Sequence, residues 1–505
     1  MNSQINEDNC FIMNSYINLK KFFDNTPLNN YGSKSRGNNK LLLADKFIDG
    51  ILSGKYKNDN EIALDLYKSK PTSKRFLMLK SRVRDQLLSY VYQIDLNKIL
   101  IGKSYGYYFV QALKLQSIGQ LMLHFGLGNE GEGLLRESLS IAKKFQATSI
   151  IIHVSRLLKG RVSYKGTTNE YNYYNGLIKE NINVYLAEIE ADDMRDALTL
   201  AYRRTFSPQE KKQLSNYWIR VNLLERKFKS FSLKMNKARI GAKYFETIGD
   251  FKGVIKVCTD CIKYMERNHV FYDITRHREF STANIEACLI LKDYKNGLKN
   301  AEICMKLYNK FSIHSVDAIN YIIWLYIHMK EYSKAWSYFN KALSHPMFNH
   351  YPDERKEKWR LYEAYLTFVA PDPQRKFKLF KFLNEMPVFS KDKRGINIAI
   401  IIAQIILLLD EGKFDTLMDK ADALNYRTFY FVKMLELLFK YSFDYKLVKR
   451  HSAPLYERLG DKEGHYQGDI EALEIIPYEA LWAEILNRLK KHESSLTEVK
   501  VLQNS

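Results

Sequence analysis

Apolar residues recur along this chain at intervals of three and four, the spacing that places them on one face of an α-helix. An early stripe of this kind is formed by Phe76, Leu79, Val83, Leu87 and Tyr90. It predicts a helix that begins near Thr72 or Ser73, where a hydroxyl group can cap the first turn. Two shorter helices are predicted before it, over Leu41–Ser53 and after Asn58-Asp59-Asn60. These three helices predict a small N-terminal unit.

Prolines are rare along the chain and widely spaced. Only ten are present, and none lies between Pro71 and Pro208 or between Pro208 and Pro346. A strand-rich or loop-rich protein would need turn residues within such stretches, whereas long helices avoid proline in their interiors. The spacing therefore indicates an all-α protein.

The region Ile319–Pro346 reads INYIIWLYIHMKEYSKAWSYFNKALSHP, which predicts two helices joined by a short charged turn. The second helix carries small and aromatic residues at helical spacing, namely Tyr332, Ala335, Phe339, Ala342 and Leu343. This unit resembles a tetratricopeptide repeat. The resemblance implies that small residues lie where the two helices cross closely, with an aromatic between them and a proline near the exit. Tyr326 stands where the first helix of that family usually has an aromatic.

Weaker copies of the second-helix pattern occur elsewhere in the chain. Their matching positions are Gly131, Leu135 and Ser138; Val254, Cys258 and Cys261; Gly297, Ala301 and Cys304; and Leu417, Ala421 and Leu424. From the first small position of each unit to the next, including Ala335, the intervals are 123, 43, 38 and 82 residues. These are close to three, one, one and two steps of about 41, which is longer than the family's usual repeat of about 34. The pattern therefore predicts repeated units with longer helices or turns.

Together these patterns predict an all-α fold: a right-handed α-solenoid of tetratricopeptide-like helical hairpins, preceded by the three-helix unit. We expect a flexible polar leader over residues 1–39, the small helical unit over 40–98, the repeats over 99–441 and a C-terminal helical cap and tail over 442–505. Within the cap, Pro454 is predicted to break the helical pattern.

Gly126-Leu-Gly-Asn-Glu-Gly131 matches the GxGxxG string of dinucleotide-binding sites, in which glycines let the backbone approach a pyrophosphate. Such a site follows a strand, whereas Gln111–Phe125 is predicted to be a helix. We therefore interpret the glycines as a turn between two paired helices.

Cys258 and Cys261 have the spacing of a redox pair or of half a zinc site. No second pair of this kind accompanies them, and all four of Cys258, Cys261, Cys288 and Cys304 fall where residues pack between helices. Packing is the interpretation that the pattern favours, because free cysteine behaves as a small apolar residue. The histidines are scattered and no nucleophile motif is present, so the pattern predicts neither an enzyme nor a bound cofactor or metal.

Arg203–Arg239 is the most basic segment, with eleven Lys or Arg against Glu210 and Glu225. An apolar stripe at helical spacing is formed by Leu214, Tyr217, Val221, Leu224 and Phe228. Lysines and arginines are predicted to project from the opposite side as one basic face, which can neutralise the phosphates of nucleic acid or bind an acidic protein. The candidate binding residues are Arg220, Arg226, Lys227, Lys229, Lys234 and Lys237. A solvated outer face of a helix is the alternative.

A second basic cluster lies in the third helix of the N-terminal unit. Its candidate residues are Lys74, Arg75, Lys80, Arg82 and Arg84. Three short helices with a basic third helix resemble the helix-turn-helix unit that some bacterial regulators join to a tetratricopeptide domain. That resemblance implies DNA binding, although many three-helix units share the outline.

The net charge of +21 favours acidic partners, although a basic surface that binds nothing is compatible with it. The first ten residues have no basic region of the kind that opens a signal peptide, and five cysteines are too few for a disulfide framework, so a reducing cytoplasm is expected. The most apolar segment, Ile396–Leu409, is too short to cross a membrane. The leading hypothesis is a non-enzymatic scaffold that binds a protein or peptide, and the alternative is a basic nucleic-acid-binding regulator or complex subunit. The sequence leaves the oligomeric state open.

Overall fold

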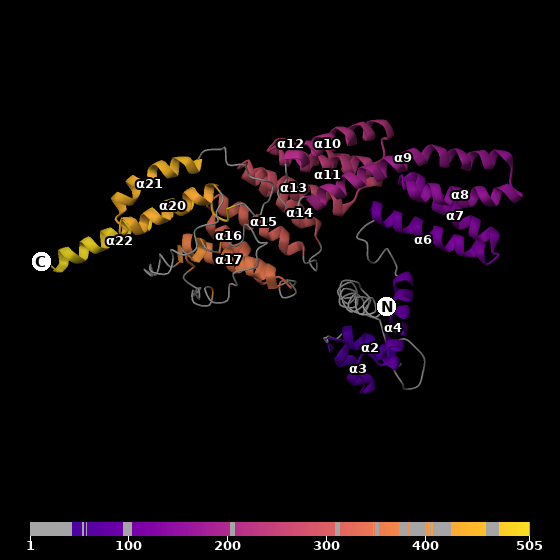
Figure 1. Cartoon of the computed structure of the whole chain (residues 1–505), viewed down its shortest axis with the longest axis horizontal. Coiled ribbons are helices and arrows are strands. Elements are labelled where there is room, and N and C mark those ends of the chain that lie inside the picture. Colours follow the sequence, from indigo (N-terminus) through magenta and orange to yellow (C-terminus); the bar gives the residue numbers. More distant parts are fainter. Residues whose placement is uncertain are drawn as a thin grey trace. The chain divides into compact units, whose positions relative to one another are not determined.

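The computed structural model describes residues 43–52, 55–56, 58–93, 104–201, 208–308, 314–346, 348, 353–372, 426–460 and 474–503, with a few single residues between 382 and 407. These residues form helices and no strand, so the predicted all-α class is confirmed for them (Figure 1). The expected leader over residues 1–39 and the repeat positions Leu417, Ala421 and Leu424 lie outside the described residues.

The chain divides into two compact units. The first contains residues 1–183 and 269–273, and the second contains residues 184–268 and 274–505. The first unit holds α2 (Leu43–Leu52), α3 (Asp59–Tyr67), α4 (Lys74–Gln93), α6 (Tyr105–His124), α7 (Gly128–Lys144), α8 (Thr148–Lys165) and a short 3-10 helix (His269–Phe271). Helix α9 (Thr168–Ala201) begins in the first unit and ends in the second.

The second unit continues from α9 with a long series of helices. They are α10 (Pro208–Phe228), α11 (Phe231–Thr247), α12 (Phe251–Arg267), α13 (Ile274–Ile290), α14 (Tyr294–Leu307), α15 (His314–His328), α16 (Tyr332–Leu343), α17 (Asp353–Val369), α20 (Tyr426–Lys440), α21 (Tyr445–Gly460) and α22 (Tyr478–Gln503). From α10 to α17, and again from α20 to α22, each helix packs against the next in the chain. The same is true of α6, α7 and α8 in the first unit.

Helices α2, α3 and α4 form the small three-helix group that the apolar spacing predicts, with Phe47, Ile62 and Phe76 fully buried in its core. The side chain of Asn58 caps α3 by accepting a hydrogen bond of 3.1 Å from the Glu61 amide. Of the stripe predicted for α4, Phe76, Leu79 and Val83 are buried, while the side chains of Leu87 and Tyr90 lie outside the described part of the chain.

One helix-to-helix turn recurs through both units. At its centre a residue adopts the left-handed conformation, and the next residue donates its amide hydrogen to the carbonyl five positions earlier, as in a Schellman cap. The left-handed residues are Gly126, Gln146, Gly249, Lys292 and Lys330, with backbone φ angles of 82°, 53°, 77°, 59° and 60°. The corresponding hydrogen bonds run from Leu127 to Met122, Ala147 to Ala142, Asp250 to Phe245, Asp293 to Cys288 and Glu331 to Tyr326. A longer version follows α20, where Ser442 and Phe443 are both left-handed.

The residue five positions after each left-handed centre enters the next helix and packs against its neighbour. At four of the five turns this residue is the first small position predicted from the sequence: Gly131, Val254, Gly297 and Ala335, all of which are buried. A methyl group added to Gly131 would lie 2.8 Å from the carbonyl oxygen of Gly119, so α6 and α7 cross there in backbone contact. The predicted packing positions are therefore confirmed at these four crossings.

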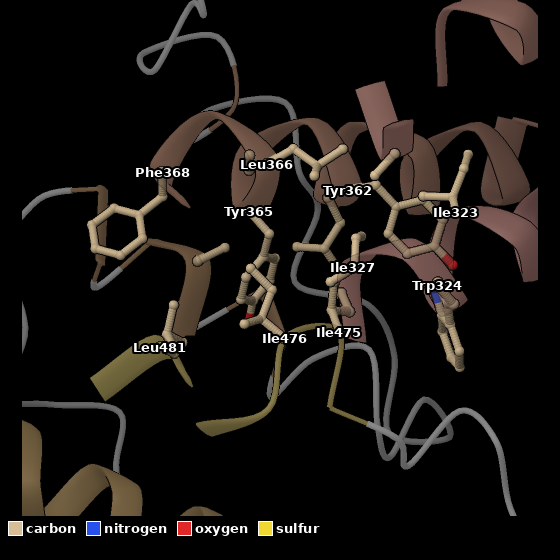
Figure 2. Packing of buried hydrophobic residues seen from close by; sticks show 14 of the residues in the cluster. Ile323, Trp324, Ile327, Tyr362, Tyr365, Leu366, Phe368, Ile475, Ile476 and Leu481 are labelled. Carbon is tan, nitrogen blue, oxygen red and sulfur yellow. The ribbon is translucent and has the colours of Figure 1, made fainter. Parts of the chain in front are cut away.

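The largest core lies in the second unit around α15 and α17. Trp324 and Tyr362 are buried with their rings edge to face at 6.2 Å, and Ile475 and Ile476, far along the chain, pack into the same cluster (Figure 2). In the Ile396–Leu409 segment, Ile400, Ile402, Ala403, Ile406 and Leu407 are buried there too, and Ala399 is partly buried.

Two predicted details are wrong. Leu343, predicted as a packing position, is 36% exposed at the end of α16, because it lies outside the face formed by Ala335, Phe339 and Ala342. Pro454 does not break the helix, since α21 runs through it from Tyr445 to Gly460. A proline removes one hydrogen bond from a helix, which the chain tolerates here.

Candidate partner-binding surface

The basic segment Arg203–Arg239 forms parts of two helices within its described residues. Helix α10 ends at Phe228, Lys229 takes the left-handed conformation, and the hydroxyl of Ser230 caps α11 by accepting a 3.1 Å hydrogen bond from the Leu233 amide. The chain therefore changes direction within the predicted face. Cations that a single helix would display together are divided between two packed helices.

Lys234 and Lys237 lie on α11 and point toward Glu225 on α10. Their ammonium groups are 3.2 Å and 3.1 Å from the two carboxylate oxygens of Glu225, and all three side chains are at least two-thirds buried. Burial favours a raised pKa for Glu225, but Lys237 and Lys234 outweigh it and lower the pKa below its usual value. The prediction that both lysines project outward with Arg226 and Lys227 is therefore wrong, because they hold α10 and α11 together.

Arg220 is exposed and meets a carboxylate of α9. Its Nε and Nη2 atoms donate to the two oxygens of Glu190 at 2.5 Å and 2.8 Å. The hydrogen bonds from Arg220 lower the pKa of Glu190 and raise that of Arg220 itself. Arg220 therefore has a counter-charge within the chain, and a partner would have to compete for it.

Arg226, Lys227 and Lys229 remain as the open part of the candidate site. All three are exposed at the end of α10, and within the described part of the chain none forms an ion pair. Lys227 contacts the ring of its neighbour Phe228, with its ammonium 5.0 Å from the ring centre. Cations in the last turn of a helix are also favoured by the helix dipole, so their position alone does not require a ligand.

In the second basic cluster, Lys80 differs from the other candidates. It is 4% exposed and its ammonium lies 2.6 Å from the carboxylate of Asp59 at the start of α3. Lys80 lies four residues after Phe76 and three before Val83, so the helical period places it on the buried side. Its assignment to an exposed basic face is therefore wrong. Lys74, Arg75, Arg82 and Arg84 are exposed, as that face requires.

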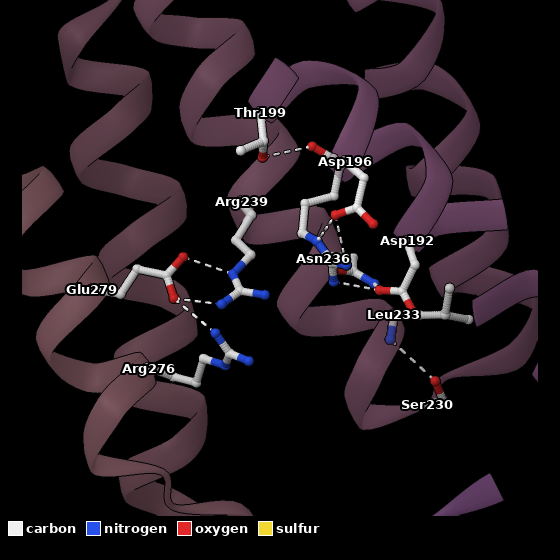
Figure 3. A network of polar contacts seen from close by, with 10 residues as sticks. Asp192, Asp196, Thr199, Ser230, Leu233, Asn236, Arg239, Arg276 and Glu279 are labelled. Atoms are coloured by element: carbon white, nitrogen blue, oxygen red, sulfur yellow. Dashed lines mark hydrogen bonds and ion pairs between the residues drawn. The ribbon is translucent and has the colours of Figure 1, made fainter. Parts of the chain in front are cut away.

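A polar network links α9, α11 and α13 (Figure 3). Asn236, 2% exposed on α11, donates to the Asp192 carboxylate at 3.0 Å and accepts from Arg195 at 3.1 Å, both on α9. On α11, Arg239 makes two hydrogen bonds of 2.7 Å and 2.6 Å to Glu279 of α13. The sequence does not reveal the contact between Asp192 and Asn236, because the two residues lie 44 positions apart on different helices. These contacts fix the positions of neighbouring helices.

The two sequence motifs that suggest chemistry lie in turn and packing positions. The GxGxxG string begins in the turn after α6 and continues into α7, so a helix precedes it. The four cysteines of the second unit are buried, and burial raises the pKa of Cys261 to about 12 and of Cys288 to about 11. Such thiols are not thiolates at neutral pH. Among the residues that the structure describes, no group of histidine, cysteine and carboxylate side chains is arranged to hold a metal ion.

An exposed apolar patch accompanies the open cations and was not predicted. It consists of Leu186 and Ile189 on α9 and Ile219 and Leu223 on α10, and we call it the α9–α10 patch. Apolar residues occur on more than one side of α9, so its sequence does not indicate which side is covered. That distinction depends on tertiary packing.

Comparison of the chain with protein-family models, with curated proteins and with solved structures found no match. None of the helices in the described ranges is long and apolar enough to cross a lipid bilayer.

Proposed function

We propose that this protein is a non-enzymatic scaffold or adaptor that binds a protein or peptide on a tetratricopeptide-like right-handed solenoid. The observation that carries the proposal is the recurring turn, with its left-handed residue and the buried position five residues later. Chain-order packing of helix pairs is how repeat proteins build an extended surface that binds other proteins.

The use of the reactive residue types supports a binding role over a catalytic one. The cysteines of the second unit fill helix crossings, and the titratable groups of the polar network hold neighbouring helices together. Four free buried thiols also fit a reducing compartment, so cytoplasmic location is part of the proposal.

Affinity purification from the native cell tests this function. The tagged full-length chain should retain a defined protein after nuclease treatment, at both low and high salt. Recovery of nucleic acid alone, lost after nuclease treatment, would refute the scaffold proposal.

A nucleic-acid-binding regulator is the second candidate, favoured by the three open cations at the end of α10 and by the exposed Lys74, Arg75, Arg82 and Arg84 of α4. Because Lys234 and Lys237 are held by Glu225, the informative change is reversal of Arg226, Lys227 and Lys229 to glutamate. Each lost phosphate contact reduces the slope of log affinity against log salt by about 0.9 on duplex DNA. An unchanged slope would remove this face as a nucleic-acid site.

A further inference from the structure

The α9–α10 patch lies on two helices that an ion pair joins. Leu186, Ile219 and Leu223 are 58%, 59% and 55% exposed. The ion pair between Glu190 and Arg220 fixes where α9 and α10 meet. Leu186 lies four residues before Glu190 and Leu223 three residues after Arg220, so each is on the same side of its helix as the ion pair. Leu186 and Leu223 therefore lie on either side of one point of contact between the two helices.

These aliphatic residues are not needed by the core beneath them. On the inner side of the same helices, Ala187 and Ala191 of α9 and Val221 and Leu224 of α10 are already buried in one cluster. The outer residues thus form a second apolar side. Exposed apolar area of this kind, edged by charged residues, is typical of a surface that binds another protein.

The charge beside the patch defines the chemistry of its partner. Arg226 and Lys227 follow Leu223 by three and four residues, which places them one turn further along α10, and Lys229 follows at the turn to α11. Among the described residues, no carboxylate pairs with these three cations. A partner that covers Leu186 and Leu223 therefore binds most tightly if it also places carboxylates beside these cations at the end of α10.

We propose that the α9–α10 patch binds an acidic amphipathic α-helix of a partner protein, with the apolar side of that helix on Leu186 and Leu223 and its carboxylates at Arg226, Lys227 and Lys229. This inference rests on the proposed scaffold function and names its partner class. Two packed helices commonly receive a third through residues at helical spacing. Nucleic acid would use the cations but would leave the aliphatic side chains without a matching surface.

A synthetic helix provides the probe. A fluorescein-labelled peptide of about 18 residues, or five turns, carries leucines at i, i+3, i+4 and i+7 and glutamates beside them. A second peptide has lysines in place of the glutamates. Fluorescence anisotropy with the full-length protein should detect binding of the acidic peptide and at least ten-fold weaker binding of the basic one. Equal binding of both peptides would overturn the proposed role of the cations.

Two variants test the two halves of the surface. Leu186→Ser with Leu223→Ser, and separately Arg226→Glu with Lys227→Glu and Lys229→Glu, should each weaken binding of the acidic peptide at least ten-fold. All these residues are exposed, so circular dichroism should show unchanged helix content. Binding that is unaffected by the leucine changes would refute the patch.

Matched controls separate a site from general charge attraction. Lys252→Glu with Lys295→Glu and Lys299→Glu reverses three exposed lysines elsewhere in the second unit, and Leu447→Ser removes a 41% exposed leucine from α21. Both controls should bind the acidic peptide within two-fold of the wild type. A charge control as weak as the α10 variant would show non-specific attraction and overturn the proposal.

Two further measurements distinguish the possible failures. Displacement of the acidic peptide by an oligonucleotide that binds the leucine variant as well as the wild type would assign this surface to nucleic acid instead. If the wild type purifies with a protein and the double leucine variant retains it fully, the scaffold function stands and this binding site is wrong. If the co-purified protein is lost from the double leucine variant but retained by Leu447→Ser, the result supports both the scaffold function and the α9–α10 binding site.

Discussion

His328 makes the stability of the second unit depend on pH. It lies in the last turn of α15, where its Nε2 atom is 3.0 Å from the carbonyl oxygen of Glu474. A carbonyl only accepts hydrogen bonds, so Nε2 carries the proton of the neutral ring and Nδ1 is the atom that titrates. The ring of Tyr294 packs edge-on against His328 at 5.9 Å.

The surroundings of His328 disfavour the charged imidazolium. Burial lowers the pKa of His328 to about 4, and the positive charge of Lys292 acts in the same direction, while the Glu474 hydrogen bond and Glu479 oppose it. The unfolded chain has a histidine pKa of about 6.5 and binds the proton more readily. The contribution of the neutral His328 ring to stability is therefore fully present above about pH 6.5, and it is lost as the pH falls toward 4.

The loss of stability follows from the difference of about 2.5 between the pKa of His328 in the folded and the unfolded chain, because each pKa unit corresponds to about 1.36 kcal/mol. The free energy of unfolding should therefore fall by about 2 kcal/mol from pH 7.5 to pH 5, and by about 3 kcal/mol from pH 7.5 to pH 4. His328→Gln is the reference, because its amide can still donate to Glu474 and does not titrate. Urea unfolding of both proteins, followed by tryptophan fluorescence between pH 7.5 and 4, gives the difference in unfolding free energy. We expect the unfolding free energy of the wild type, minus that of the variant, to fall by about 3 kcal/mol between pH 7.5 and pH 4. A difference that stays constant within about 1 kcal/mol would show that His328 titrates normally, and it would contradict the burial of its ring.

Three other changes give direct measurements. Gly249→Ala places a side chain at a φ of 77° with open space around it, so thermal unfolding should show a free energy of unfolding lower by about 1–2 kcal/mol, from backbone strain alone. Lys292→Gly changes the same position of another turn in the opposite sense and should raise the free energy of unfolding by about 0.5–1 kcal/mol. A gain for both would contradict the shared turn. Lys80→Met leaves the Asp59 carboxylate without its 2.6 Å contact and should lower the free energy of unfolding, measured by thermal unfolding, by about 2 kcal/mol. An unchanged free energy of unfolding would mean that this contact contributes nothing to stability. In a Cys10→Ser variant the remaining thiols should react with Ellman's reagent only after unfolding, and rapid reaction in the native protein would contradict their burial.

The helix crossings were predictable because packing restricts the residue types that fit. Gly297, Ala301 and Cys304 are small, lie at helical spacing and are all buried. A methyl group on Gly297 would come within 2.7 Å of Leu325, so the sequence pattern directly reflects the close approach. The turn at Gln146 was missed because the buried residue five positions later is Ile151, a larger side chain than those at the predicted crossings.

The candidate surface was predicted less well, because the sequence does not show which charged residues pair with each other within the chain. Lys234 and Lys237 look like Arg226 in the sequence, yet they pair with Glu225 once the chain turns at Ser230. A serine that begins a new helix was the available signal for that turn. The burial of Lys80 was within reach of the helical period, whereas the exposure of Leu186 depends on which neighbours cover α9.

The recurring turn also provides fixed attachment points. Main-chain hydrogen bonds hold it, and the side chains of Lys292 and Lys330 at its centre are exposed. Cysteines introduced at these two positions, in a variant without other reactive thiols, would carry spectroscopic labels whose separation reports the distance between the two turns. Because these side chains are exposed and the buried crossing residues lie five positions further along, new chemical groups could be attached at the turns while the helix crossings stay unchanged.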